Sequence, residues 1–191
     1  LNFLHMKRHN KILTILVLVL FSTMAQAQSS YSIAETGSKI TVSGTSNLHD
    51  FTLVSEEIKG SADLYMEGSE ITGIKKVVVT LKTESLESSK SGLKRNAMKT
   101  LQPEANPIIS YIAFDMADDG KVSGILNVAG YDSDQDFSFT SKVENGKLVV
   151  TAQGDVKFTD FDLDPPSALA GTIKAKDDLQ LEIILVLEEE K

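Results

Sequence analysis

The chain has 191 residues with a formal net charge of −8, 41% of its residues are hydrophobic, and it contains no cysteine and no tryptophan. This length predicts a single domain with a substantial hydrophobic core, and the lack of cysteine excludes disulfides, thiolate metal ligands and thiol nucleophiles. The 27 acidic residues outnumber the 19 basic ones, which argues against a nucleic-acid partner, since such proteins bind phosphates through lysine and arginine.

The first 27 residues are predicted to be upstream residues followed by a secretory signal peptide. Residues 7–11 are rich in lysine and arginine, residues 12–21 are apolar except for Thr14, and Ala25-Gln26-Ala27 has the small-x-small form of a cleavage site. A transmembrane anchor is disfavoured because ten residues rise only about 15 Å as a helix. We therefore expect residues 28–191 to be a single exported domain, periplasmic or secreted, whose 16 basic and 27 acidic side chains give a net charge of −11.

Residues 28–191 alternate between apolar and polar side chains, the period expected of antiparallel strands. The alternation covers 31–34, 39–43, 51–55, 58–65, 77–82, 108–116, 122–129, 137–143, 148–158 and 181–187. Turn sequences such as Glu67-Gly68 and Glu144-Asn145-Gly146 separate these runs. The pattern predicts eight to ten strands joined mainly as hairpins, with residues 188–191 as a solvated tail.

One segment departs from this pattern. In residues 89–102, Leu93, Ala97 and Leu101 recur every four residues and Pro103 follows, which predicts a helix of about three turns. A single helix among many strands favours a barrel or a sandwich with a lid or plug.

His49 is the only histidine of residues 28–191, so a multi-histidine metal site is excluded there. Its neighbour Asp50 suggests a general base, but the G-x-S-x-G motif of a serine hydrolase is missing. A turn histidine that hydrogen-bonds to the surrounding structure is the favoured interpretation.

Two acidic clusters are candidate cation sites. Asp132-x-Asp134-x-Asp136 resembles the start of a calcium loop, but Phe137 stands where that loop needs glycine and Val143 where it needs glutamate. Asp160, Asp162 and Asp164 would share one face of a strand, and the prolines that follow favour a solvated strand end. We expect no metal site and no catalytic residue.

The inward faces of the predicted strands are aliphatic or phenylalanine. A closed sheet of about eight strands has an interior that side chains can fill, or that can hold one slender ligand. Periodicity leaves both alternatives open: a fully packed core, or an apolar tunnel with the helix at its mouth.

Several segments, in order, resemble the YceI-like family of exported, lipocalin-like proteins. They are residues 43–51 (SGTSNLHDF), 58–64 (IKGSADL), 93–112 with the strand closing at Phe114, 158–166 (FTDFDLDPP), and 171–183. The chain departs from the family pattern after residues 126–130, where Tyr131-Asp132-Ser133-Asp134 replaces a threonine and a basic residue.

The resemblance implies an all-β fold, an eight-stranded antiparallel lipocalin-like barrel with one short helix at its mouth. It also implies an apolar lumen that holds an isoprenoid-type lipid, such as a quinone or a polyprenyl chain, and no other cofactor. We expect the lumen to be lined by Ile40, Val42, Phe51, Val77, Val79, Leu81, Phe114, Val128, Phe137, Phe139, Val150 and Phe158. Leu93, Ala97 and Leu101 are expected to gate it.

Two hypotheses follow. The first is a non-catalytic carrier for an isoprenoid lipid; the second is a structural or interaction barrel with a packed core and no lipid. A hydrolase that uses His49 is a third, disfavoured one. The acidic surface predicts only transient membrane contact, and the sequence leaves a homodimer open.

Overall fold

The structure, a computed structural model of the chain, describes residues 27–117 and 119–190. The predicted leader therefore lies outside the described residues, except for Ala27. The strands are β1 (Ala27–Ile33), β2 (Lys39–Ser46), β3 (Asp50–Ser55), β4 (Ile58–Glu67), β5 (Glu70–Lys82), β6 (Ile108–Met116), β7 (Lys121–Val128), β8 (Tyr131–Glu144), β9 (Lys147–Lys157), β10 (Ser167–Ala168) and β11 (Ile173–Glu189). The helices are α2 (Ser91–Leu101) and two short 3-10 helices, η1 (Thr83–Ser85) and η2 (Phe158–Phe161).

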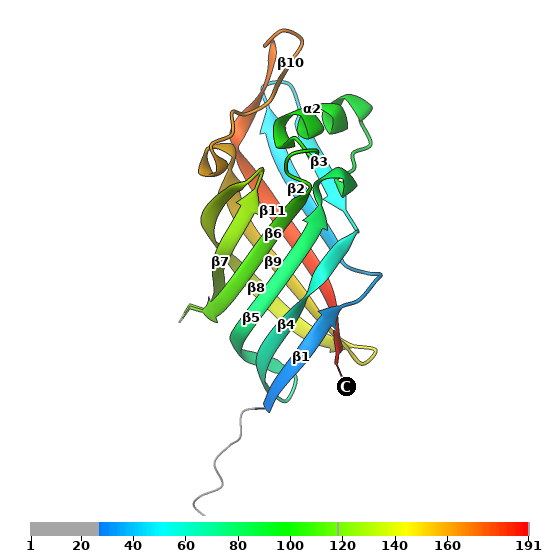
Figure 1. Cartoon of the computed structure of the whole chain (residues 1–191), viewed down its shortest axis with the longest axis vertical. Helices are drawn as coiled ribbons and strands as arrows, with labels where there is room; N and C mark the ends of the chain where they lie inside the picture. The colour runs from blue at the N-terminus through cyan, green and yellow to red at the C-terminus, as the bar shows by residue number, and fades with distance from the viewer. Residues whose placement is uncertain (1–26, 118, 191) are drawn as a thin grey trace, which may run out of the picture.

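Eight of the strands form a closed ring in the order β1, β4, β5, β6, β7, β8, β9 and β11 (Figure 1). The pairing of β1 with β11 closes the ring, and all neighbouring strands run antiparallel. Closure leaves few open sheet edges and gives each ring strand one inward and one outward face. The predicted all-β antiparallel fold with one α-helix is thus confirmed.

Acidic residues near the C-terminus complete the ring instead of forming a solvated tail. Glu188 and Glu189 belong to β11, opposite Ser32 and Tyr31 of β1. Lys147 lies 2.6 Å from Glu188, with its ammonium nitrogen facing Oε1. The expected tail was wrong because charged side chains can point outward from a strand whose backbone is fully paired.

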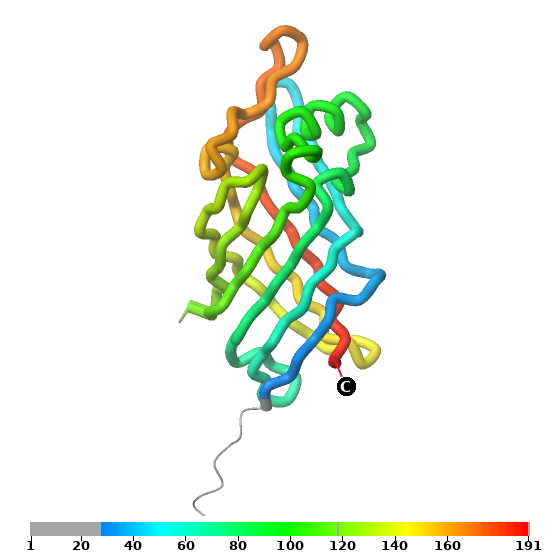
Figure 2. Tube along the Cα trace, viewed as in Figure 1, coloured from blue at the N-terminus to red at the C-terminus, as the bar shows by residue number. Residues whose placement is uncertain are grey.

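The β2–β3 hairpin extends the wall beyond the closed ring. One edge of β11 pairs with β9, whereas its other edge pairs first with β2 and then with β1. Figure 2 shows β11, in orange and red, running along the molecule between these partners. The free edge of β3 makes a two-way backbone bridge between Val54 and Glu87, with N–H···O distances of 2.9 and 2.7 Å. This bridge connects the hairpin to the segment that leads into α2.

Helix α2 lies over the end of the ring to which β2 and β3 contribute (Figure 1). It spans Ser91–Leu101, within the predicted 89–102, and Ala97 and Leu101 are buried. The helix ends at Gln102, whose φ of 50° is left-handed and whose N–H donates to the Met98 carbonyl at 2.9 Å. Pro103 follows and cannot continue the helix.

Turn chemistry fixes the strand register. Asn145 and Gly146, both with positive φ, form the tight turn between β8 and β9, the conformation that asparagine–glycine pairs favour in two-residue hairpins. Gly60 in β4 has a φ of 152°, and a Cβ there would lie 1.9 Å from the Val78 carbonyl oxygen. Only glycine therefore fits this close approach of β4 to β5.

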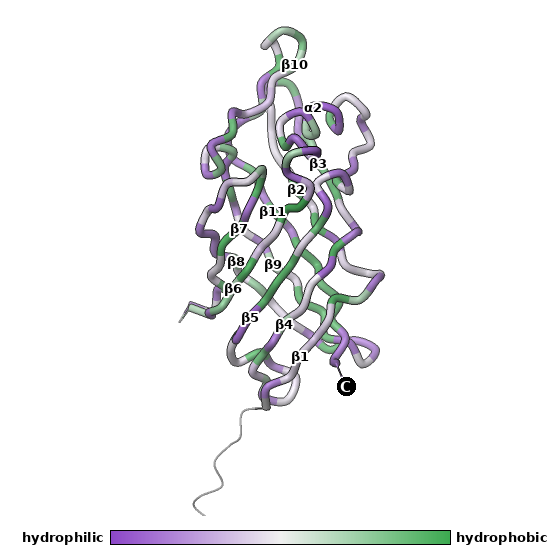
Figure 3. Tube along the Cα trace, in the orientation of Figure 1, coloured by the Kyte–Doolittle hydropathy of each residue, from purple (hydrophilic) through white to green (hydrophobic). Residues whose placement is uncertain are grey.

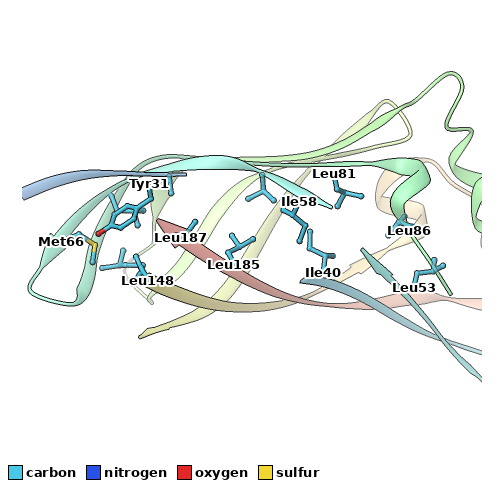
Figure 4. Packing of buried hydrophobic residues seen from close by; sticks show 14 of the residues in the cluster. Tyr31, Ile40, Leu53, Ile58, Met66, Leu81, Leu86, Leu148, Leu185 and Leu187 are labelled. Atoms are coloured by element: carbon cyan, nitrogen blue, oxygen red, sulfur yellow. The ribbon is translucent and has the colours of Figure 1, made fainter. Parts of the chain in front are cut away.

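Alternation of hydrophobic and hydrophilic residues runs along the ring strands in Figure 3. At the end of the ring opposite α2, the interior is solidly packed by Tyr31, Met66, Leu148 and Leu187 (Figure 4). These four residues are at most 9% exposed, and we call them the floor. Among the described residues, every buried side-chain nitrogen and oxygen has a hydrogen-bond partner.

Candidate functional site: an apolar lumen

Above the floor the ring is hollow. A cavity of about 200 Å³ lies inside it. Counting all unfilled space, including the part that opens to solvent, the volume is about 1630 Å³. We call this cavity the lumen. An apolar cavity of ~150 Å³ in another protein stays dry and admits benzene, so this space is large enough to accept an apolar guest.

The lining is almost purely hydrocarbon. Of the 33 residues around the lumen, only Ser110 and Tyr111 carry a polar side chain. Inward residues in the middle of the strands, such as Val77, Phe139 and Val150, are only half-buried although they face the interior. They keep accessible surface because they border an empty space, whereas the floor residues do not.

The lumen is closed at the floor and reaches the opposite end of the ring, which we call the mouth. Helix α2 covers the mouth on one side, where Leu93, Ala97 and Leu101 contribute to the lining. On the other side Phe161 and Pro166, from η2 and the segment after it, complete the rim. The site is therefore a blind apolar pocket with its entrance beside α2.

Eleven of the twelve residues predicted to line the lumen do so. They are Ile40, Val42, Phe51, Val77, Val79, Leu81, Val128, Phe137, Phe139, Val150 and Phe158. The three predicted gate residues of α2 also contact the lumen. These residues can be located from the alternation because every second side chain of a strand points to the same face. Ring closure turns that face toward the interior.

Phe114 is the exception, and its predicted position was wrong. It is 59% exposed on the outside of the ring. In β6 the residues that face inward are Ile109, Tyr111 and Ala113, so Phe114 falls on the opposite face. The pairing of β6 with β7 also shifts register between Ala113 and Asp115, which leaves Phe114 as the extra residue of a bulge.

Bulges also explain two lining residues that the pattern missed. In β5 the register with β4 shifts twice, between Asp63 and Leu64 and between Tyr65 and Met66. Each shift inserts one residue into β5, so the inward face passes from Val77 to Ile74 and then to Ile71. A strict period of two cannot follow such insertions.

The segment that follows β9 supplies further lining residues that were not predicted. Instead of a strand end, residues 158–161 form η2, which a left-handed residue, Asp162, ends. The Asp160 carboxylate accepts the Lys157 backbone N–H at 2.7 Å and so helps to cap this turn. Phe161 and Leu163 turn toward the lumen while the aspartates stay near the surface. The three exposed aspartates therefore lie in η2 and in the segment after it, not along one face of a strand.

Aromatic rings lie against the wall of the lumen instead of filling its centre, because glycines make room for them. A Cβ on Gly44 would lie 2.4 Å from the ring of Phe51, and one on Gly154 would lie 2.7 Å from the ring of Phe137. Gly154 stands opposite Phe137 on the neighbouring strand, since Gln153 pairs with Ser138. These inward glycines help to keep the lumen open, a role that the alternation of side chains does not reveal.

Tyr111 brings the one hydroxyl among the aromatic lining residues, and that hydroxyl is bound to the wall. Its Oη donates toward the carbonyls of Val122 and Gln135 at 3.2 and 3.1 Å. The ring packs edge-on against Phe137, with centroids 5.1 Å apart. Burial, and to a lesser extent the Asp136 carboxylate, raises the pKa of Tyr111 well above its ordinary value, so the phenol stays neutral.

The other candidate residues lie outside the lumen. His49 is exposed in the β2–β3 turn, where its Nδ1 lies 3.1 Å from the Asp50 carbonyl oxygen. Asp132, Asp134 and Asp136 lie on the outward face of β8. Within residues 27–117 and 119–190, no three histidine, aspartate or glutamate side chains group closely enough to hold a metal ion. In the same residues, no helix has the length and hydrophobicity needed to cross a bilayer.

Comparison with solved structures shows the same fold in proteins of low sequence identity. BcnA of Burkholderia cenocepacia matches with a TM-score of 0.65 and 11% identity over 81% of this chain and 98% of that one. A polyisoprenoid-binding domain from Saccharophagus degradans, implicated in plant cell wall breakdown, matches with a TM-score of 0.58 and 12% identity. The match covers 85% of this chain and 99% of that one. The YceI protein of Campylobacter jejuni matches with a TM-score of 0.54 and 19% identity over 77% of this chain and 85% of that one.

No curated protein matches the chain. The YceI-like domain family, in contrast, matches residues 25–187, which include the β2–β3 hairpin, α2 and the whole ring except the last two residues of β11. This match extends over most of the sequence and agrees with the fold of the solved structures. The chain therefore belongs to the YceI-like domain family.

Proposed function

We propose that this protein is a non-catalytic carrier that holds one isoprenoid-type lipid, a quinone or a polyprenyl chain, in its lumen. Family membership and the likeness to a polyisoprenoid-binding domain support a binding role. The observation that carries the proposal is the blind cavity with its hydrocarbon lining. Such a surface shelters a long apolar chain from water, and none of the lining side chains is charged.

The shape of the lumen suggests how the lipid lies. The floor blocks one end, so the tail enters through the mouth and points toward Leu148 and Met66, while the polar head stays near α2. A ligand of about thirty heavy atoms that gains roughly 0.3 kcal/mol per atom binds with about −9 kcal/mol, which corresponds to a sub-micromolar Kd.

The alternative of a barrel with a packed core finds less support. The floor residues fill one end of the ring, but a cavity lined by hydrocarbon remains in the rest of the interior. The proposal also includes export through the predicted signal peptide, with residues 28–191 acting in the periplasm or outside the cell.

Uptake of an offered lipid tests the proposal. The protein is stripped of bound lipid by unfolding and extraction, refolded, mixed with an isoprenoid quinone and separated by gel filtration. Because the chain has no tryptophan and only four tyrosines, its own absorbance is weak and the quinone is easily measured. We expect about one quinone for each chain; refolded protein that elutes without quinone would contradict the proposal.

A further inference from the structure

The mouth end of the molecule carries the two most exposed large hydrophobic side chains among the described residues. Leu169 is 73% exposed in the turn between β10 and β11, and Leu48 is 65% exposed in the turn between β2 and β3. Figure 1 shows β10, the tips of β2 and β3, and α2 at the same end of the molecule. Single exposed leucines are common, but two at the tips of the same end form an apolar front beside the entrance to the lumen.

Hydrogen bonds hold both tips in place. The Asn47 side chain donates from Nδ2 to the Thr172 carbonyl at 2.9 Å and accepts from the Lys174 N–H at 2.9 Å. This single side chain therefore joins the β2–β3 turn to the base of the β10–β11 turn. The leucines are presented by an ordered pair of turns, so their insertion into another phase needs little additional ordering.

Next to these tips lies the most basic stretch of an acidic protein. Residues 88–103, which include α2, contain four basic residues and no acidic one, whereas residues 28–191 as a whole carry −11. Lys90, Arg95 and Lys99 are exposed. Lys94 is ion-paired with Glu87, the carboxylate just before this stretch, so the two charges neutralise each other.

We propose that the mouth end docks on a bilayer that contains anionic lipids. Leu48 and Leu169 enter the headgroup region and the exposed cations of α2 contact lipid phosphates, with the mouth facing the membrane. This inference rests on the proposed function, because docking in this orientation would let a lipid pass between bilayer and lumen without crossing water. Each cation near an anionic surface strengthens binding about fivefold, while the acidic remainder of the protein is repelled, so contact is oriented and reversible.

Three variants test the surface. Leu48→Ser with Leu169→Ser removes the apolar tips, and Lys90→Gln with Arg95→Gln and Lys99→Gln removes the exposed cations. Val143→Ser is the matched control, because Val143 is 53% exposed but lies opposite the floor residue Leu148, at the far end of the ring. Each protein is floated with vesicles of phosphatidylcholine alone, or of equal parts phosphatidylcholine and phosphatidylglycerol.

We expect the native protein and the control to bind the anionic vesicles. The leucine variant should bind at least about tenfold more weakly, since it loses the burial of two leucines. The charge variant should lose affinity for anionic vesicles on the order of a hundredfold, because three cations are removed. Its affinity for neutral vesicles should change almost not at all. Native protein that fails to float with anionic vesicles, or variants that float as well as it does, would overturn the docking proposal.

Quinone uptake from detergent, measured on the same samples, separates this proposal from the proposed function. Variants that fill normally from detergent but exchange quinone with anionic vesicles more slowly would support docking. Native protein that floats with vesicles but takes up no quinone would refute the carrier function and leave the docking result standing.

Discussion

Replacing Val79 with tryptophan is expected to close the lumen while the ring stays folded. Val79 is 8% exposed, lines the lumen, and stands between Gly60 of β4 and Tyr111 of β6. An indole at this position would project across a passage that is only wide enough for one slender chain. A ligand tail would then occupy only the space on the mouth side of the substitution.

The cost follows from the number of ligand atoms that are excluded. If two isoprene units, about ten carbon atoms, lose their place at about 0.3 kcal/mol each, binding weakens by about 3 kcal/mol, or roughly 150-fold. A sub-micromolar Kd would rise to tens of micromolar. Overpacking is expected to lower the free energy of unfolding by about 1–3 kcal/mol.

Val78→Trp is the matched control. Val78 is the neighbouring residue on β5, opposite Ile112 on the outward face, so a tryptophan there adds the same side chain outside the lumen. Quinone titration should show the loss of affinity for Val79→Trp alone, and urea unfolding should confirm that both variants are folded. Full uptake by folded Val79→Trp, or an equal loss in Val78→Trp, would refute this account of the lumen.

Three further predictions concern the floor, the wall and one surface carboxylate. Leu148→Ala should deepen the lumen and shift preference toward longer isoprenoid chains in a competition assay, with about 2–5 kcal/mol lost from the free energy of unfolding; an unchanged length preference would contradict the assigned floor. Gly154→Val should push the Phe137 ring into the lumen and weaken quinone binding, whereas unaltered affinity would show that the glycine does not keep the lumen open. The Asp177 carboxylate accepts hydrogen bonds from the Thr159 hydroxyl at 2.6 Å and the Thr159 N–H at 3.0 Å, and these lower the pKa of Asp177. Because the folded pKa lies below the unfolded one, this link stabilises the fold above the unfolded value of about 3.9 and is lost as the pH falls through the folded pKa. Asp177→Asn should therefore lower the urea midpoint at pH 7 and differ little from the native protein in strong acid, and an equal difference at both pH values would contradict this link.

Much of the lumen could be predicted from the sequence because the ring turns a local alternation into a global inside and outside. Phe137 and Phe139 alternate with polar neighbours, and ring closure turns the face that they share toward the interior. The single helix was predictable for a similar reason, since its apolar stripe has no counterpart in the strands.

The errors arose where the backbone departs from regular geometry. Bulges moved Ile71 and Ile74 inward, and Phe114 lies outward where the register of β6 shifts, changes that side-chain pattern alone does not reveal. The charge of Glu188 favours a solvated tail when only the side chains are considered, whereas its backbone pairs with Ser32 of β1. The interior is hollow or filled according to how the circumference of the ring compares with the volume of the inward side chains. That comparison depends on residues far apart in the chain, such as Gly154 and Phe137, and the sequence alone leaves it open.

Extraction of the protein from its native host tests the central claim most directly. The protein is purified without detergent, denatured and extracted with organic solvent, and the extract is analysed by mass spectrometry. The account predicts one long-chain isoprenoid lipid in near-stoichiometric amount, and less than a tenth of it from Val79→Trp, following the expected drop in affinity. Folded native protein that yields no lipid, or an equal yield from both proteins, would contradict it.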